Sequence, residues 1–565
     1  MQLHDWKRWP MALVLFAAIL PTQAQADGDL RTVALTGQQA PGTADGVSFF
    51  DLDAFDFANT GDIAFQAFVD GPGVNAANFI GIWSESQGAL GLVAREGDQA
   101  PGVPDGLVFS NLAFPVIDEQ GRSTFQSELS GFQTIDEAIW EGVWSETASG
   151  LMNLAATQSE VEGLPAGFNW GLFSEEIQST SKGFGINATT GLNGLGSFQT
   201  AGTLMLDKGF QLVSRSLDQA PGHSDGVVFI SFNPNGFGND PVDFNDVGDT
   251  VFVGQLGQQN SGSAVPNGVF SNRNGGLALI VSEGEPAPGV EGDVSFVSFR
   301  HDLMEISNAG EIVFYANVEG DGITPGFNSS GIWSDAGSSQ LQLIVQNKDA
   351  APGFQEGVQF ATLGRPSPGE PGQVYFTATV EGGGIDLLDF VGGLWLSENG
   401  GDPTPVFIDG DQAPGLPTGI TLDGIGSPVV NALGQYMIRA GLEGVGISDS
   451  NNGGIWAKSL DDVLSLVVQV GDEIDVNDDP LIEDLRTIAT IGFGAFAPQL
   501  NDRGEIAFHA TFTDGTSGIF VSKAVAIPEP SALALSLLGI ASFIGCSLRL
   551  SNHRFRFKVR IDAGH

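Results

Sequence analysis

Cysteine is almost absent from this chain of 565 residues: the only one, Cys546, lies in an apolar run near the C-terminus. The body of the chain therefore contains no disulfide bond and no cysteine-based metal site. Histidines are few and scattered. The sequence also has no HExxH motif, no phosphate-binding loop and no GxSxG motif between a strand and a helix. The zinc, nucleotide and serine-hydrolase chemistries that these motifs serve are excluded in their usual forms.

Basic residues are the second scarcity. The chain has 22 Lys and Arg against 68 Asp and Glu, which gives a net charge of −46. Such a negative field repels phosphate backbones, so we expect no nucleic-acid partner. The apolar content of 42% excludes a disordered chain. An acidic surface of this kind suits an exported soluble body or one that binds cations.

Residues 1–26 have the pattern of a secretory signal peptide. A short basic region is followed by the apolar residues 11–20, and Ala24 and Ala26 form a small-x-small cleavage site. The apolar stretch is too short to span a bilayer. We therefore expect an exported protein whose mature chain begins near Asp27.

The C-terminal end has three parts in a fixed order. Residues 525–531 contain a Pro-Glu-Pro tripeptide, formed by Pro528, Glu529 and Pro530. Residues 532–550 are apolar and about long enough for one membrane-spanning helix, and residues 551–565 form a basic tail that favours the cytoplasmic side.

This order resembles the PEP-CTERM sorting signal of bacterial exosortase substrates. The resemblance implies that exosortase and the secretion machinery are partners of the protein. It also implies that the chain is held transiently in the inner membrane, cut near the motif, and delivered to the cell surface or the extracellular matrix. An ordinary C-terminal anchor that stays attached is the alternative interpretation.

Three markers recur in the same order through residues 27–524, a region with abundant glycine and phenylalanine. The first is Ala-Pro-Gly after an apolar stretch and a turn, with clear copies that end at Gly42, Gly102, Gly222, Gly289, Gly353 and Gly415. The second is a turn glycine before an alternating strand, with copies at Gly61, Gly121, Gly183, Gly248, Gly310, Gly372, Gly434 and Gly504. The third is Gly-apolar-aromatic, which ends at Trp83, Trp144, Phe270, Trp333, Trp395, Trp456 and Phe520.

The spacing of these markers predicts eight repeats of about 62 residues, each with about four short strands. Such repeats favour an all-β, eight-bladed β-propeller, and a β-helix is less suitable because its rungs are usually shorter. The last repeat has no strand after its aromatic residue, whereas residues 30–35 form a strand with no repeat before it. We expect this N-terminal strand to complete the last blade, because closure of the ring removes an exposed sheet edge.

Residues 501–508 match the pattern NxxGxxAF in full, with Asn501, Gly504, Ala507 and Phe508 at its fixed positions. The segment resembles the bacterial choice-of-anchor tandem-repeat family that this pattern defines. The resemblance implies an architecture and a location, but no chemistry. In physical terms, Asn-x-x-Gly suits a tight turn.

The absence of catalytic motifs predicts a structural or binding protein that is not an enzyme and needs no cofactor. Trp140 and Trp170 lie outside the repeated aromatic position and are candidates to stack on a sugar. Residues 243–248 and 475–479 space their oxygen donors as calcium loops do, but neither has the final glutamate, so solvated acidic turns are the preferred interpretation.

Two alternative functions stay open. One is a propeller that binds carbohydrate, with extracellular polysaccharide as a candidate partner. The other is a propeller glycosidase or polysaccharide lyase, because a catalytic carboxylate pair could be hidden among so many acids.

Overall fold

The computed structural model describes residues 30–522 apart from 132–139, 162–163, 165, 174–178, 181–182, 193–196, 206–208, 233–242, 260–262, 387–389, 460–462, 478, 480 and 493–496. All 37 elements in this part of the chain are β-strands. The described residues accordingly include no helix that is long and apolar enough to cross a membrane. The predicted signal peptide, with Ala24 and Ala26, and everything from the sorting motif to the basic tail lie outside them.

The strands form eight antiparallel sheets, numbered here in chain order. The first sheet contains β2 (Ser48–Phe57), β3 (Ile63–Asp70), β4 (Ile80–Ser84) and β5 (Gly91–Arg95). The second contains β6 (Leu107–Ile117), β7 (Ser123–Gly131), β8 (Trp140–Thr147) and β9 (Gly150–Ala156). The third contains β10 (Phe168–Phe173), β11 (Ser179–Thr180), β12 (Gly183–Leu192), β13 (Ser197–Met205) and β14 (Gly209–Arg215). The fourth contains β15 (Val227–Ser231), β16 (Asp243–Phe244), β17 (Thr250–Gln258), β18 (Ala264–Ser271) and β19 (Ala278–Ser282).

The other four sheets follow the same plan. The fifth contains β20 (Val294–Ile306), β21 (Ile312–Gly320), β22 (Ser330–Ser334) and β23 (Gln342–Gln346). The sixth contains β24 (Val358–Pro368), β25 (Gln373–Gly382), β26 (Gly392–Glu398) and β27 (Thr404–Ile408). The seventh contains β28 (Ile420–Asp423), β29 (Val429–Val430), β30 (Tyr436–Gly444), β31 (Gly453–Lys458) and β32 (Leu464–Gln469). The eighth contains β33 (Glu473–Asp475), β34 (Leu485–Ile491), β35 (Gln499–Leu500), β36 (Ile506–Phe512), β37 (Ser517–Ser522) and β1 (Leu30–Leu35).

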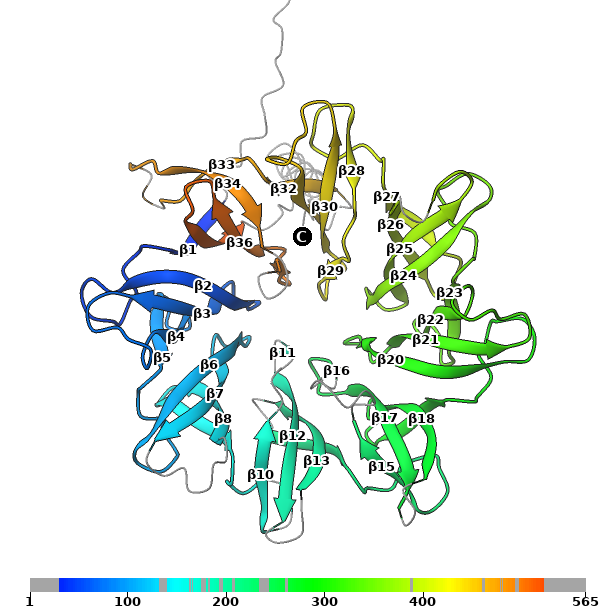
Figure 1. The fold of residues 1–565 in the computed structure, drawn as a ribbon, viewed down its shortest axis with the longest axis horizontal. Helices are drawn as coiled ribbons and strands as arrows, with labels where there is room; N and C mark the ends of the chain where they lie inside the picture. Colours follow the sequence, from blue (N-terminus) through cyan, green and yellow to red (C-terminus); the bar gives the residue numbers. More distant parts are fainter. Residues whose placement is uncertain are drawn as a thin grey trace, which may run out of the picture.

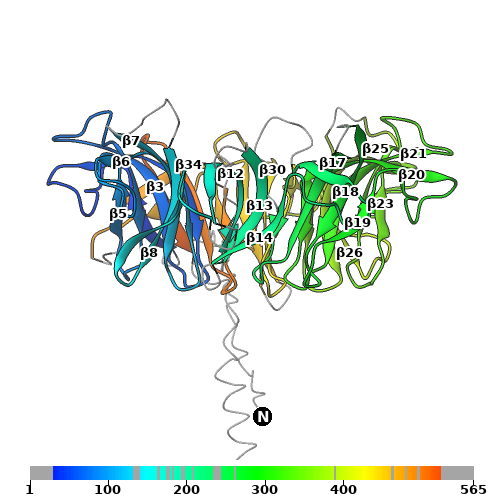
Figure 2. The same cartoon turned by 90° about the horizontal axis from the view of Figure 1, so that it is seen from below.

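The sheets are arranged around a common centre, so that the first and the eighth lie next to each other (Figure 1). Seen from the side, they stand in a low ring (Figure 2). The N-terminal strand β1 pairs with β37, from Leu30 opposite Ser522 to Leu35 opposite Gly518. This pairing is the one that ring closure requires. The all-β, propeller-like part of the predicted fold is thereby confirmed.

The hydrophobic core lies between adjacent sheets, because each sheet buries both of its faces. In the NxxGxxAF segment, Ala507 belongs to the core cluster that contains Phe65 of the first sheet, whereas Phe508 belongs to the cluster that contains Ile455 of the seventh. Both motif residues are fully buried, and as neighbours on β36 they point to opposite faces of the sheet.

The repeated tryptophans connect the first and third sequence markers. Trp83, Trp144, Trp333, Trp395 and Trp456 are completely buried. Each indole N–H donates a hydrogen bond of 2.9–3.0 Å to the carbonyl of the proline in the preceding Ala-Pro-Gly. The tryptophans thus fill space and fix a loop at the same time.

The glycine before each tryptophan has a steric reason. A Cβ atom on Gly81 would lie 2.7 Å from two ring carbons of Trp83, since the indole folds back over that position. The same contact recurs between Gly331 and Trp333 at 2.8 Å. Only glycine permits this packing, which explains the Gly-apolar-aromatic pattern.

Candidate functional site: a central cavity lined by the repeat turns

The turns between β2 and β3, between β6 and β7 and between β20 and β21 point to the centre of the ring (Figure 1). At Asn501 the side-chain oxygen accepts hydrogen bonds from the amides of Arg503 (3.0 Å) and Glu505 (2.9 Å). Gly504 has a φ of 76°, which glycine adopts without strain. The asparagine therefore satisfies the amides of the turn, and the glycine allows the chain to reverse.

The same asparagines join neighbouring sheets. Nδ2 of Asn431 donates to the carbonyl oxygen of Asn501 at 2.9 Å, from the seventh sheet to the eighth. Nδ2 of Asn501 donates in turn to the carbonyl oxygen of Ala58 in the first sheet, at 3.2 Å. Asn245 makes the equivalent bond to Ser307, at 2.8 Å. One side chain thus stabilises both a turn and the seam between two sheets.

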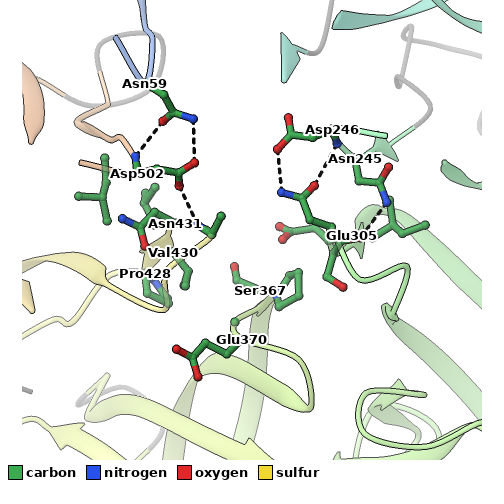
Figure 3. A pocket seen from close by; sticks show the side chains of 18 of the residues that line it. Asn59, Asn245, Asp246, Glu305, Ser367, Glu370, Pro428, Val430, Asn431 and Asp502 are labelled. Atoms are coloured by element: carbon green, nitrogen blue, oxygen red, sulfur yellow. Dashed lines mark hydrogen bonds between the residues drawn. The ribbon is translucent and has the colours of Figure 1, made fainter. Parts of the chain in front are cut away.

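The residue after the asparagine position faces the centre and forms reciprocal pairs. Nδ2 of Asn59 donates to Asp502 at 2.7 Å, and the amide of Asp502 donates to the side-chain oxygen of Asn59 at 2.8 Å. Nδ2 of Asn308 donates to Asp246 at 2.7 Å, and the amide of Asp246 donates to Asn308 at 3.0 Å. The two pairs lie on opposite sides of the central space (Figure 3).

These turns surround a cavity of about 860 Å³, whose lining residues, among those that the structure describes, come from seven of the eight sheets. Its acidic lining residues are Asp56, Asp246, Glu305, Glu370 and Asp502. Arg365 is the one basic residue among the lining residues that the structure describes. Apolar side chains also line the wall, among them Pro428 and Val430 of the seventh sheet (Figure 3), and Ile117 and Ile306 of the second and fifth sheets. The wall of the cavity therefore combines acidic and amide groups with apolar side chains.

Burial perturbs three carboxyl groups, of which Asp56 and Glu305 line the cavity and Asp243 lies next to the lining residue Phe244. Burial raises the pKa of Asp243 to about 8, and the neighbouring Glu305 adds to the rise, while the Ile306 amide and Arg365 oppose it. Burial likewise raises the pKa of Glu305, against the opposing effect of Arg365. Burial also raises the pKa of Asp56 to about 6, although its hydrogen bond from the Ile117 amide acts in the other direction.

The residues five positions before the turn glycines were not predicted to act as a group, although Asp243 was considered as part of a calcium loop. Asp56 and Asp243 occupy this position in the first and fourth repeats, and each accepts the amide of the next sheet, at 2.8 and 2.7 Å respectively. Gln499 occupies it in the eighth repeat and donates to the carbonyl oxygen of Phe55 at 2.8 Å. The sequence did contain a signal for these residues. A polar residue stands five positions before the turn glycine in the first, fourth and eighth repeats, and a fixed position in a repeat falls at the same place in each sheet.

The two tryptophans proposed as sugar platforms do not line the cavity. Trp170 is 4% exposed and packs against Phe173 and Phe210, with ring centroids 5.4 and 4.9 Å apart. Trp140 is half-buried beside the core between the first and second sheets. Packing between sheets accounts for both positions, and the structure does not bring them together.

The acidic stretches considered for calcium use their oxygens within the chain. Oδ1 of Asp475 accepts the amides of Asn477 (3.0 Å) and Asp484 (2.9 Å), and Asp479 accepts the amide of Leu481 (3.0 Å). Within the residues that the structure describes, no group of three or more His, Cys, Asp or Glu side chains is placed to hold a metal ion.

The fold and this cavity define the chain as an all-β, propeller-like repeat protein. The sequence belongs to a family of unknown function, DUF7453, whose model matches residues 20–141, 110–406 and 389–534. Among curated proteins, none matches the sequence.

Solved structures of similar fold share little sequence with the chain. A puromycin hydrolase is 8% identical with a TM-score of 0.32, and the match covers 85% of this chain but only 61% of the hydrolase. A Penicillium chrysogenum α-L-arabinanase is 10% identical with a TM-score of 0.23, covering 62% of this chain and 93% of the arabinanase. A Trypanosoma rangeli sialidase is also 10% identical with a TM-score of 0.23, covering 76% of this chain and 57% of the sialidase.

These neighbours correct one prediction. They are enzymes by their names, which contradicts the expectation, drawn from the missing motifs, that the chain is not an enzyme. Motifs such as HExxH report only some chemistries, and acids contributed by separate repeats leave no local signature. The likeness is too weak to assign an activity to this protein.

Proposed function

We propose that the protein is an exported, closed eight-bladed propeller whose central cavity binds a segment of neutral polysaccharide. The observation that carries this proposal is the cavity of about 860 Å³, whose wall combines amide and carboxylate groups with apolar side chains. A sugar ring has hydroxyl groups at its edge and an apolar C–H face, so it matches such a wall on both counts. Pockets of this size commonly enclose a small ligand and use a few polar groups to orient it.

Charge narrows the class of ligand. The lining contains five acidic residues and one arginine, within a chain whose net charge is −46. A polyanion would be repelled both at a distance and inside the cavity. Neutral polysaccharide is therefore the proposed ligand, and its hydroxyl groups can donate hydrogen bonds to the carboxylates.

A matched pair of substitutions at one turn tests the proposal. Ala432 is exposed and lines the cavity, whereas its neighbour Leu433 is 48% exposed and does not line it. We expect Ala432→Trp to fill the cavity and weaken retention on arabinan, galactan or β-1,3-glucan in affinity electrophoresis at least about tenfold, with Leu433→Trp as the unaffected control. Equal binding by both variants, or no retention of the wild type on any neutral polysaccharide, would count against the cavity as the site.

Hydrolysis of the bound polysaccharide is the second candidate function. It is favoured by the carboxyl group of Asp56, which lines the cavity and whose pKa burial raises to about 6. A carboxyl group that titrates near neutrality is suited to general acid catalysis. Release of reducing ends that Asp56→Asn abolishes would support it, and binding without any release in the wild type would exclude it for the polysaccharides tested.

Export and exosortase processing complete the proposal. The sorting-signal resemblance of Pro528, Glu529 and Pro530, together with the choice-of-anchor resemblance of the repeats, supports a place at the cell surface or in the extracellular matrix. Mass spectrometry of the native protein should find an N-terminus near Asp27 and no peptide beyond the sorting motif. An intact tail on the mature protein would instead favour a permanent anchor.

A further inference from the structure

One segment of the cavity wall contains a charged cluster that spans three adjacent sheets. Asp243 on β16 accepts the Ile306 amide across the seam between the fourth and fifth sheets, at 2.7 Å. Glu305, at the end of β20, lies beside Asp243 and forms an ion pair with Arg365 on β24, with 2.5 Å between Oε1 and Nε. The side chain of Glu305 is 20% exposed and that of Arg365 is 45% exposed. A change in this cluster therefore reaches two seams and the cavity at once.

The proton on Asp243 decides the charge of this cluster. Because burial and Glu305 raise its pKa to about 8, Asp243 is largely neutral at pH 7, and Glu305 keeps Arg365 as its partner. The strand β17, which pairs with β16, carries no titratable side chain. On β20, Arg300 donates a hydrogen bond to Asp302 and lowers the pKa of that carboxyl group, so Asp302 stays ionised. His301 stands between these two residues in the sequence. The charge of Asp302 also raises the pKa of Arg365.

The first repeat provides a natural comparison. Asp56 accepts the Ile117 amide just as Asp243 accepts that of Ile306. The position that Glu305 occupies in the fifth repeat is Val116 in the second, so the seam at Asp56 has no second carboxylate at that position. In keeping with this difference, the pKa of Asp56 is raised only to about 6.

We propose that Asp243, Glu305 and Arg365 form a proton-controlled latch in the cavity wall. With its proton, Asp243 accepts the Ile306 amide and leaves the Glu305–Arg365 pair intact. When the proton leaves, two carboxylates compete for one guanidinium group, and the seam between the fourth and fifth sheets is weakened. Its effect on a ligand rests on the proposed function, because only then does the cavity have an occupant to release.

The latch makes stability fall with rising pH in a defined window. A carboxyl group with a raised pKa binds its proton more tightly in the folded state than in the unfolded chain, where it titrates near 3.8. The contribution of Asp243 to the free energy of unfolding is fully present below pH 3.8. It is lost as the pH rises to about 8 and changes no further above that pH. The equivalent loss for Asp56 is complete near pH 6.

The test compares Asp243→Asn and Asp56→Asn with the wild type, since asparagine keeps the acceptor oxygen but does not titrate. Melting temperatures are measured from pH 4 to 9.5 at constant ionic strength. We expect the difference between wild type and Asp243→Asn to change by about 3 °C or more and to level off only near pH 8. The difference for Asp56→Asn should level off near pH 6. A flat difference for Asp243→Asn, or one that ends where that of Asp56→Asn ends, would overturn the proposal.

Two further measurements keep the outcomes separate. Glu305→Gln removes the neighbouring charge, so we expect the high-pH step to move below 8; an unmoved step would exclude Glu305 from the latch, even if Asp243→Asn does not fold. Retention on neutral polysaccharide is then measured across the same pH range. If the melting temperature shows the step but the protein binds no polysaccharide at any pH, the latch is supported and the proposed function is rejected. If the protein binds polysaccharide but the melting temperature shows no step, the proposed function is supported and the latch is rejected.

Discussion

The contacts between the sheets and the turns at the centre are both built from repeated motifs, but they vary to very different degrees. Five sheets use the same buried tryptophan, the same proline carbonyl and a hydrogen bond of the same length. At the centre, the residue after the asparagine position is Asn59 in one repeat, Asp246 in another and Glu370 in a third. Where every sheet meets the same packing problem, the solution is uniform. Where the side chains face a cavity, each sheet contributes a different group.

This comparison separates two kinds of evidence. A residue that recurs at the same place in most repeats serves the packing that all repeats share. A residue that differs between repeats at one position is free to make an asymmetric site in an otherwise symmetric ring. The position after the asparagine, where Asn59, Asp246 and Glu370 line the cavity, is such an asymmetry.

Removal of the closing strand should have the largest effect. Deletion of residues 27–35 removes the partner of β37 and the buried side chains of Val33 and Ala34. We expect a loss of more than about 5 kcal/mol, because the edge of β37 is exposed together with the core between the eighth and first sheets. Differential scanning calorimetry measures it, with a deletion of residues 27–29 as the control. An unchanged melting temperature would indicate an open array in place of a closed ring.

A repeated contact between sheets should rank second. Trp395→Ala is expected to cost about 3–5 kcal/mol, since it empties a fully buried site. Trp395→Phe keeps most of the ring but leaves the Pro352 carbonyl without its donor, so a cost of about 1–3 kcal/mol is expected. Equilibrium denaturation measures both variants. If Phe were tolerated without loss, space filling alone would explain the repeated tryptophan.

A substitution at the central turns should cost less. Asn431→Asp keeps the oxygen that accepts the Leu433 and Gln435 amides but replaces the Nδ2 donor to Asn501 with an acceptor. We expect a loss of about 1–3 kcal/mol. Leu433→Ala, in the same turn but exposed, serves as the control and should change stability by less than about 0.5 kcal/mol. Equal effects of the two substitutions would mean that the asparagine does not hold the seam.

The smallest effect concerns the acidic turns outside the centre. Asp475 and Asp479 already accept amides of their own loop, so millimolar calcium should stabilise the protein no more than sodium chloride at matched ionic strength. Thermal melts in the two salts measure the difference. A gain specific to calcium that Asp479→Ala abolishes would instead reveal a metal site at this loop.

Much of the fold was accessible from the sequence, because it depends on local patterns. The turn glycines, the alternating strands and the Gly-apolar-aromatic pattern each reflect the conformation of a few neighbouring residues, and their spacing predicts the repeating sheets. The strand at residues 30–35 and its pairing with the last sheet also followed, since a missing strand at one end matched an extra one at the other. The hydrogen bond between each tryptophan and a proline about 42–45 residues earlier was not predicted, although both residues were recognised as markers.

The cavity was decided by the tertiary structure alone. Asp56, Glu305, Arg365 and Asp502 are separated by tens to hundreds of residues, and nothing local distinguishes them from the other charged residues of the chain. They meet only because successive sheets turn around a common centre and place their hairpins at its edge. Their unusual protonation has the same origin, since a carboxyl group such as Asp243 is perturbed by burial and by a neighbour from another sheet. The sequence by itself determined the repeating unit, whereas the arrangement of the units around a common centre decided which side chains share a site.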